Sequence, residues 1–133
     1  RLHPVLGVVR AHKGTDYAAP SGTKIWAAGE GRIAFVGRKG GYGNAVVINH
    51  GKGITTLYGH MSRFGKSARN GRSVRQGEII GYVGSTGRST GPHLHYEVRI
   101  AGSAVNPVPY MVETEAQRGL ALADGEGGRG GAE

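Results

Sequence analysis

Glycine is the feature that most limits the folds open to this chain. It supplies 26 of the 133 residues, against an average usage of about 7%. The glycines form no single tract but separate short apolar runs rich in β-branched residues. Glycine provides the positive φ angles of tight turns, and the short gaps between the runs leave no room for helical crossovers. The pattern therefore predicts an all-β domain with antiparallel pairing.

The expected strands are short, and turn residues bound nearly all of them. They cover residues 24–27, 32–36, 45–49, 54–58, 79–83 and 94–100. Glycines spaced through residues 71–87 indicate strands that turn a corner. We therefore expect a compact antiparallel β-sheet domain of the sandwich or barrel-like kind.

The length of the chain suits one domain rather than two. We expect this domain to cover residues 1–112, beginning with an extended arm, and a flexible or disordered tail to cover residues 113–133. The tail has weak helical character at 113–123 and is mostly glycine with charges from 124 onward. Because the chain starts at Arg1, with neither an initiator Met nor a signal-peptide pattern, we expect a processed or excised domain whose targeting or regulatory region lies outside this sequence.

Charge and composition narrow the classes of partner. The 17 Lys and Arg residues outnumber the 9 Asp and Glu residues, which gives a formal charge of +8 and favours a polyanionic partner. Aromatic residues make up only 7% of the chain, and the basic residues are scattered over turns, so we expect no nucleic-acid partner. The absence of cysteine excludes disulfides and thiolate metal sites. No stretch is long enough for a transmembrane helix, and we expect a monomer.

The run from 91 to 99 contains a His-x-His pair. The two-residue period of a strand puts His93, His95 and Glu97 on one face. Buried polar groups need partners, and a metal ion would provide one. A solvated strand face is the commoner explanation for an isolated His-x-His.

A second group of candidate ligands lies near the start of the chain, at His12 and Asp16. Gly14 and Thr15 oppose a helix between them, so we expect a loop that enters a strand. Imidazole and carboxylate are suitable zinc ligands, and two such ligands plus one distant imidazole leave the fourth tetrahedral position free for water, as in a catalytic site. A simple turn residue is the alternative for Asp16.

The other histidines have ordinary explanations. His60 falls at the end of the strand expected over 54–58, where a turn residue is common. His3 and His50 are expected to be structural.

Three segments resemble the lysostaphin-type (LytM-like) zinc endopeptidases, a family of peptidoglycan hydrolases. They are His-x-Gly-x-Asp at 12–16, Tyr-Gly-His-Met-Ser at 58–62, and Gly-Ser-Thr-Gly-Arg-Ser-Thr-Gly-Pro-His-Leu-His-Tyr-Glu at 84–97. Weaker likeness at 40–44 and 105–107 extends the resemblance from about residue 3 to residue 110. The resemblance implies a β-sheet-rich domain with an active-site groove across the sheet and one zinc ion on the groove floor.

The resemblance also implies the metal ligands, which would be His12, Asp16 and His95. His93 and His60 would flank the attacking water. We interpret His93 as the general base, because the chain lacks the His-Glu-x-x-His motif that supplies a glutamate in other zinc peptidases. His60 would assist the oxyanion or the leaving amine.

The remaining candidates surround these five positions. Glu97 is expected to orient a ligand imidazole, with a surface ion pair to Arg32 or Arg99 as the alternative. We read the glycine-rich run 84–91 as a wall of the groove. The candidate substrate contacts are Tyr42, Asn44 and Thr90.

The expected function is a zinc metalloendopeptidase that hydrolyses peptide cross-links of bacterial peptidoglycan in the cell envelope, periplasmic or secreted. Peptidoglycan stem peptides would be the partner, and likeness to Gram-negative enzymes favours the D-Ala to meso-diaminopimelate bond. Three alternatives stay open: a catalytically silent module that binds the wall or activates an amidase, a biotinyl or lipoyl carrier domain suggested by residues 74–81, and a zinc hydrolase of other peptides. The five occupied site positions oppose the first, and the lack of a lysine in a suitable hairpin opposes the second.

Overall fold

A computed structural model describes residues 8–11, 14–101 and 103–105 of the chain. Within these ranges it contains ten β-strands and one short 3-10 turn. All strand pairings are antiparallel, which confirms the all-β prediction. The expected N-terminal arm and C-terminal tail lie outside the described residues, apart from the part of the arm at 8–10.

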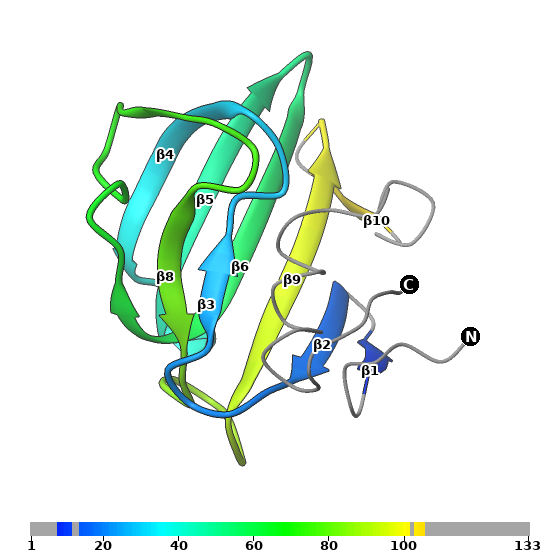
Figure 1. The fold of residues 1–133 in the computed structure, drawn as a ribbon. Coiled ribbons are helices and arrows are strands. Elements are labelled where there is room, and N and C mark those ends of the chain that lie inside the picture. Colours follow the sequence, from blue (N-terminus) through cyan, green and yellow to red (C-terminus); the bar gives the residue numbers. More distant parts are fainter. Residues whose placement is uncertain (1–7, 12–13, 102, 106–133) are drawn as a thin grey trace.

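The main path of the sheet runs β1-β2-β9-β6-β5-β4-β7, with β10 beside β9 and β3 beside β8. The elements are β1 (Val8–Ala11), β2 (Gly14–Ala18), β3 (Lys24–Trp26), β4 (Gly31–Arg38), η1 (Gly40–Tyr42), β5 (Asn44–Gly51), β6 (Ile54–Phe64), β7 (Ser73–Val74), β8 (Ile79–Val83), β9 (His93–Ile100) and β10 (Ser103–Val105). Figure 1 shows β3 and β8 lying in front of β5 and β6. The sheet therefore folds over itself into two layers, as a sandwich requires.

Strand β6 is the element shared by both layers. Its first six residues pair with β9 and its last residues pair with β8. At the junction His60 has a φ of 61°, a value that is uncommon for residues other than glycine. The sequence predicted a strand that ends near Tyr58, and this is wrong, because the backbone at His60 redirects the strand instead of ending it and β6 continues to Phe64.

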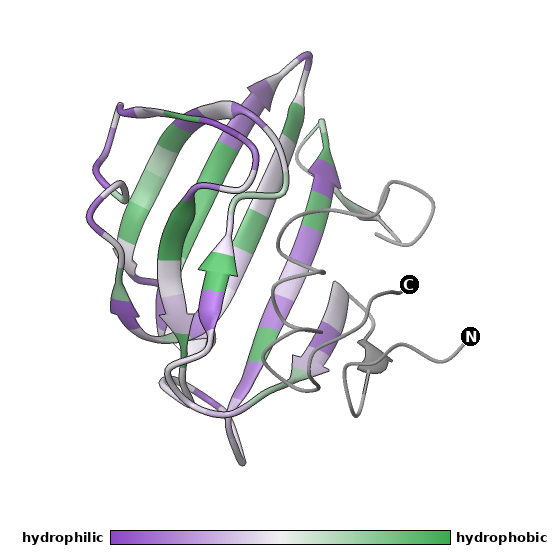
Figure 2. Cartoon of the chain, viewed as in Figure 1, coloured by the Kyte–Doolittle hydropathy of each residue, from purple (hydrophilic) through white to green (hydrophobic). Residues whose placement is uncertain are grey.

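The hydrophobic core lies between the layers. Along β9, Leu94, Tyr96 and Val98 are buried in it, and hydrophobic and hydrophilic residues alternate along this strand in Figure 2. The rings of Tyr58 and Tyr96 lie 5.4 Å apart within the core. This packing fixes the side of β9 that faces inward, so the other side is left for polar residues.

The buried hydroxyl of Tyr58 ends a chain of hydrogen bonds that includes His50. Tyr58 accepts a bond from the Ala28 amide at 3.0 Å, its hydroxyl lies 2.8 Å from Thr56 Oγ1, and Thr56 lies 2.7 Å from His50 Nε2. His50 Nδ1 donates to the Glu30 carbonyl at 2.7 Å. Leaving a buried hydroxyl without a partner costs about 1–3 kcal/mol. By bonding to Thr56, His50 helps to satisfy these buried hydroxyls, which is the structural role expected for it from the sequence.

Strand β2 brings the N-terminal candidate residues to the sheet. It pairs with β9, and Asp16 stands directly opposite His95. A side chain at Gly14 would meet the Tyr96 carbonyl and the Glu97 side chain. Glycine therefore permits the close contact between β2 and β9, and the predicted loop at this point is a strand from residue 14 onward.

Candidate active site

The site is built on the polar face of β9. His93, His95 and Glu97 are the alternate residues of the strand whose intervening neighbours enter the core. This confirms the face predicted from the two-residue period. His12 lies outside the described residues, so the first predicted ligand has no described position.

An imidazole and a carboxylate meet at the centre of the site. His95 Nδ1 lies 2.7 Å from Asp16 Oδ1, and His95 Nε2 lies 2.8 Å from Glu97 Oε2. Burial alone would lower the pKa of His95, but its hydrogen bonds to Glu97 and Asp16 outweigh burial and raise the pKa. Each ring nitrogen of His95 is thus directed at one carboxylate.

Glu97 is fully buried and saturated with donors. Besides His95, the Tyr42 hydroxyl donates to its Oε2 at 2.6 Å and Arg99 Nε donates to its Oε1 at 2.9 Å. Burial would raise the pKa of Glu97, yet the bonds from His95, Tyr42 and Arg99 lower it to about 2. The alternative prediction is a surface ion pair between Glu97 and Arg32 or Arg99. Arg99 does pair with Glu97, but the pair is not on the surface, because the Glu97 carboxylate is buried and is also bonded to His95. Arg32 instead donates to the Gly71 carbonyl.

Two further imidazoles stand beside this centre. The rings of His60 and His93 lie 4.6 Å apart. His93 Nδ1 donates to the Gly91 carbonyl at 2.8 Å, and His60 Nδ1 donates to the Thr86 carbonyl at 2.6 Å. Because a carbonyl only accepts, Nδ1 of each neutral ring carries the proton and Nε2 keeps a lone pair. His93 Nε2 lies 3.7 Å from Asp16 Oδ1.

The pKa of His60 is lowered from its ordinary value. Burial is the main cause, and the bond to the Thr86 carbonyl acts in the opposite direction. His60 therefore stays neutral to a lower pH than a free histidine.

The glycine-rich loop and the 3-10 turn form one wall beside the histidines. The Asn44 amide donates to Thr86 Oγ1 at 3.1 Å, and the Asn44 side chain donates to the Met61 carbonyl at 3.1 Å. Gly43 and Gly87, both with positive φ, approach so closely that a side chain on either would meet the backbone of the other loop. Gly43 and Asn44 therefore stand directly against the glycine-rich run.

Two hollows open at the histidines. One, of about 220 Å³, is lined by Gly41, Tyr42, His60, Arg88 and His95. The other, of about 460 Å³, is lined by Asp16, His60, Gly87, Arg88, Ser89, Thr90, His93 and His95. Of the three candidate substrate contacts, Tyr42 and Thr90 line a hollow, whereas both nitrogens of Asn44 are engaged within the wall.

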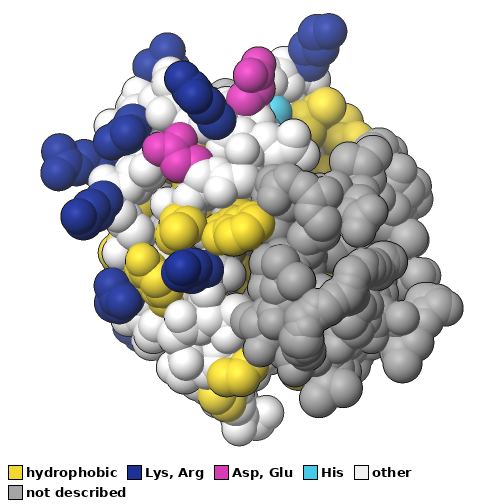
Figure 3. Space-filling model, viewed as in Figure 1, with side chains coloured by type: hydrophobic (Ala, Val, Ile, Leu, Met, Phe, Trp, Pro, Cys, Tyr) yellow, Lys and Arg dark blue, Asp and Glu magenta, His cyan; other side chains and the backbone are white. Residues whose placement is uncertain are grey.

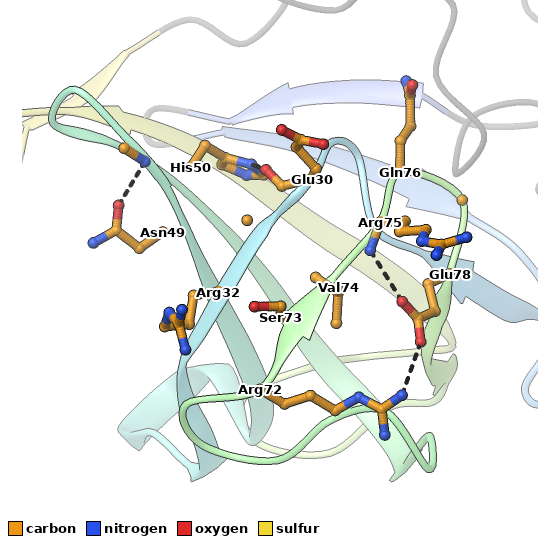
Figure 4. A pocket seen from close by; sticks show the side chains of 13 residues that line it. Glu30, Arg32, Asn49, His50, Arg72, Ser73, Val74, Arg75, Gln76 and Glu78 are labelled. Carbon is orange, nitrogen blue, oxygen red and sulfur yellow. Dashed lines mark hydrogen bonds and ion pairs between the residues drawn. The ribbon is translucent and has the colours of Figure 1, made fainter.

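A larger hollow lies away from this chemistry. It has a volume of about 1120 Å³ and shares no lining residue with the two hollows at the histidines. Figure 4 shows Arg72 reaching Glu78 across its lower edge and His50 and Glu30 at its upper edge. It contains none of the imidazoles with a free nitrogen, so size is a poor guide to the site here.

The donors at the centre fit part of a zinc site. Within residues 8–11, 14–101 and 103–105, no group of three His, Cys, Asp or Glu residues could hold a metal ion. Asp16 Oδ1 and His95 Nδ1 nevertheless converge at 2.7 Å, and oxygen with nitrogen is a suitable donor pair for zinc. The second nitrogen of His95 faces a carboxylate, the usual arrangement behind a metal-bound histidine.

The described surface is rich in positive charge. Lys and Arg side chains spread over the upper and left parts of the view in Figure 3, with few acidic groups among them.

Among the described residues, no helix has the length and apolar character needed to cross a membrane.

The sequence left three parts of the site unrecognised. They are the donation from Tyr42 to Glu97, the anchoring of His60 by the Thr86 carbonyl, and the presence of Arg88 in both hollows. Each joins segments far apart in the chain, so strand periodicity carried no signal for them.

The antiparallel sheet thus carries a carboxylate and an imidazole suited to a metal, with two more imidazoles that keep free nitrogens, and such a set of groups is typical of metal-dependent hydrolases. The sequence pattern of Peptidase family M23 matches residues 10–107. The chain belongs to this family, which confirms the resemblance seen in the sequence.

Relatives with known names agree with this assignment. The chain is 59% identical over 114 residues to the DD-carboxypeptidase/endopeptidase Mpg of Neisseria meningitidis, covering 86% of this chain and 26% of Mpg. It is 49% identical to the peptidoglycan DD-endopeptidase ShyC of Vibrio cholerae, covering 80% of this chain and 24% of ShyC. The chain thus spans about a quarter of the length of these two relatives.

A solved structure supports the same fold. A zinc-containing peptidase from Vibrio cholerae is 39% identical, with a TM-score of 0.67, and the match covers 79% of this chain and 32% of that one.

Proposed function

We propose that the chain is the catalytic part of a zinc endopeptidase that cleaves peptide cross-links of bacterial peptidoglycan, at the bond between D-Ala and meso-diaminopimelate. The proposal rests above all on Asp16 and His95, whose donor atoms converge at 2.7 Å beside two imidazoles with free nitrogens. The similarity to Mpg and ShyC supports both the polymer and the D,D bond.

One zinc ion per chain would be held by His12, Asp16 and His95. When bound, zinc lowers the pKa of water to about 7 and polarises the scissile carbonyl. As a ligand, His95 would use an unprotonated Nδ1, and its Nε2 would donate to Glu97.

His93 acts as the general base. Its Nδ1 donates to the Gly91 carbonyl at 2.8 Å, so its Nε2 is free to take a proton, and Nε2 lies 3.7 Å from Asp16 Oδ1. As the proton moves to Nε2, the oxygen of the water attacks the carbonyl carbon. The neutral state of His93 is required, since an imidazolium has no lone pair to accept the proton.

His60 assists when the carbon–nitrogen bond breaks. The amine must leave with a proton, and a protonated imidazole in the His60–His93 pair can deliver it. The Thr86 carbonyl holds the His60 ring in place through Nδ1, so only Nε2 is available for this transfer or for stabilising the oxyanion.

Glu97 positions His95 and does not touch the substrate. Its carboxylate is fully buried and fixed by Tyr42 and Arg99. This fixed acceptor sets the orientation of the His95 ring and favours the tautomer that keeps Nδ1 for the metal.

The substrate would lie along the groove as an extended stem peptide. Tyr42 lines one of the two hollows at the histidines and Thr90 lines the other, and we propose that Asn44 supports the wall beside them. The protein would act as a monomer in the cell envelope, periplasmic or secreted, where its formal charge of +8 attracts it to anionic wall polymers.

The test is mass spectrometry of fragments released from purified peptidoglycan sacculi. Zinc-loaded protein is expected to convert cross-linked dimers to monomers with a new D-Ala terminus, and a chelated sample is expected to leave the dimers intact. Intact dimers with zinc bound would favour a silent wall-binding or amidase-activating module.

The variant His93→Ala separates the base from the ligands. We expect it to bind zinc as the unaltered protein does and to lose at least about 100-fold in turnover. His50→Gln removes an imidazole outside the site and serves as the control. Full turnover by His93→Ala would contradict the assignment of the base.

A further inference from the structure

Arg88 lies where the two hollows at the histidines meet. It lines both of them, and no other Lys or Arg among the described residues does so. Its side chain is exposed, so solvent and a bound peptide can reach it. A positive charge is therefore present at the mouth of the site, beside His60 and His95.

The backbone of Arg88 is held firmly, whereas its guanidinium is free. The Arg88 amide donates to the Gly41 carbonyl at 2.8 Å, within the wall that also joins Gly43 to Gly87. Across the part of the chain that the structure describes, the guanidinium has no hydrogen bond or ion pair. Because its backbone is fixed and its guanidinium is unpaired, Arg88 is already positioned to bind an anion.

The carboxylates near Arg88 are engaged elsewhere. Glu97 is buried and bonded to His95, Tyr42 and Arg99, and Asp16 is bonded to His95. The charge on Arg88 is therefore not needed to neutralise the protein around the site.

We propose that Arg88 forms a subsite for a free carboxylate of the substrate, next to the amide that is cleaved. This inference rests on the proposed function, because it concerns the peptide bound in the same groove. In the D-Ala to meso-diaminopimelate bond, the carbon attached to the scissile nitrogen also carries a free carboxyl group. The guanidinium fork suits this group, since it binds carboxylates through two parallel hydrogen bonds.

The experiment uses two synthetic cross-linked peptides that differ at one group. In one, the carboxyl beside the scissile nitrogen is free, and in the other it is a carboxamide. The kcat and KM of both are measured for the unaltered chain, Arg88→Gln, Arg88→Lys and the control Arg69→Gln, which changes an exposed arginine on the connection between β6 and β7.

The unaltered chain and Arg69→Gln are expected to prefer the free carboxylate by about 10- to 100-fold in kcat/KM, the range of a charge-assisted hydrogen bond. The preference should lie mainly in KM, because the carboxylate does not change during the reaction. Arg88→Gln is expected to reduce the preference to within about 2-fold, and Arg88→Lys to keep part of it.

Equal cleavage of both peptides by the unaltered chain would overturn the subsite and leave the proposed function standing. An undiminished preference in Arg88→Gln would also overturn it. Cleavage of neither peptide by the zinc-loaded chain would overturn the proposed function and the subsite with it.

Discussion

Glu97 and Glu78 are two carboxylates whose pKa values are both lowered, and they lie in contrasting surroundings. Glu97 has no exposed side-chain surface and reaches His95, Tyr42 and Arg99. Glu78, in the large hollow of Figure 4, has a side chain 28% exposed and reaches Ser67, the Arg75 amide and Arg72. Hydrogen bonds from Ser67 and then Arg75 are the main causes of its lowered pKa.

The difference lies in what each carboxylate connects. The partners of Glu78 are all within 11 residues of it, so it stabilises one turn. Tyr42 is 55 residues from Glu97, and the bonds of Glu97 end at a candidate metal ligand. A buried carboxylate can thus couple the fold to the chemistry, whereas a partly exposed one acts locally.

The largest expected effect is that of Glu97→Gln. A fall in the pKa of Glu97 from 4.5 to about 2 corresponds to about 3 kcal/mol at neutral pH, and loss of one partner of a buried ion pair costs about 3–5 kcal/mol. We therefore expect the free energy of unfolding, measured in urea, to fall by about 3–5 kcal/mol. The affinity for zinc should fall about 10- to 100-fold. A loss below about 1 kcal/mol would show that the network contributes little.

The same variant has a pH signature. Because the folded pKa of Glu97 lies below the unfolded value, its contribution is complete above about pH 4.5 and is lost as the pH falls toward about 2. The difference in stability between the metal-free protein and Glu97→Gln should therefore shrink across this window. A difference that stays constant with pH would assign the effect to packing.

An intermediate effect is expected for Tyr42→Phe. This change removes the donor at 2.6 Å from Glu97 Oε2 and keeps the ring that lines the groove. A hydrogen bond to a charged group contributes about 1.5–3 kcal/mol, and the half-buried position of Tyr42 favours the lower end. Tyr82→Phe is the matched control for urea unfolding, since its ring stacks under Arg63 and its hydroxyl has no partner among the described residues. Equal losses in both variants would contradict a special role for the Tyr42 hydroxyl.

The smallest effect is expected for Glu78→Gln. A partly exposed ion pair contributes about 0–1 kcal/mol, and the amide oxygen of glutamine can still accept from Ser67. We expect a loss of at most about 1 kcal/mol in urea unfolding and no change in peptide cleavage. A loss as large as that of Glu97→Gln would remove the contrast between the two carboxylates.

The sequence was informative wherever local geometry decides the outcome. The two-residue period of a strand put His93, His95 and Glu97 on one face, and turn glycines marked most strand ends. These features depend on neighbours within a few residues. The all-β fold class and the wall of the groove at the glycine-rich run could therefore be predicted from the sequence.

Features that depend on distant contacts left no signal in the local pattern of residues. Asp16 and His95 are 79 residues apart, so only the family resemblance put them at one site, and the pairing of β2 with β9 is what brings them together. His60 was expected at a strand end, but its φ of 61° lies within β6, where the strand changes partners. Tyr42 was expected to contact substrate through the groove, yet its hydroxyl is engaged by Glu97.

The mutual approach of Gly43 and Gly87 has a consequence for protein engineering. A side chain at either position would collide with main-chain atoms of the opposite loop. A second substitution cannot relieve this clash, because it changes side chains and leaves the main chain in place. The two loops are therefore a single module. A graft intended to alter which peptides are cleaved would have to transplant both loops together from one donor, and exchanging either loop alone would split the wall that carries Arg88.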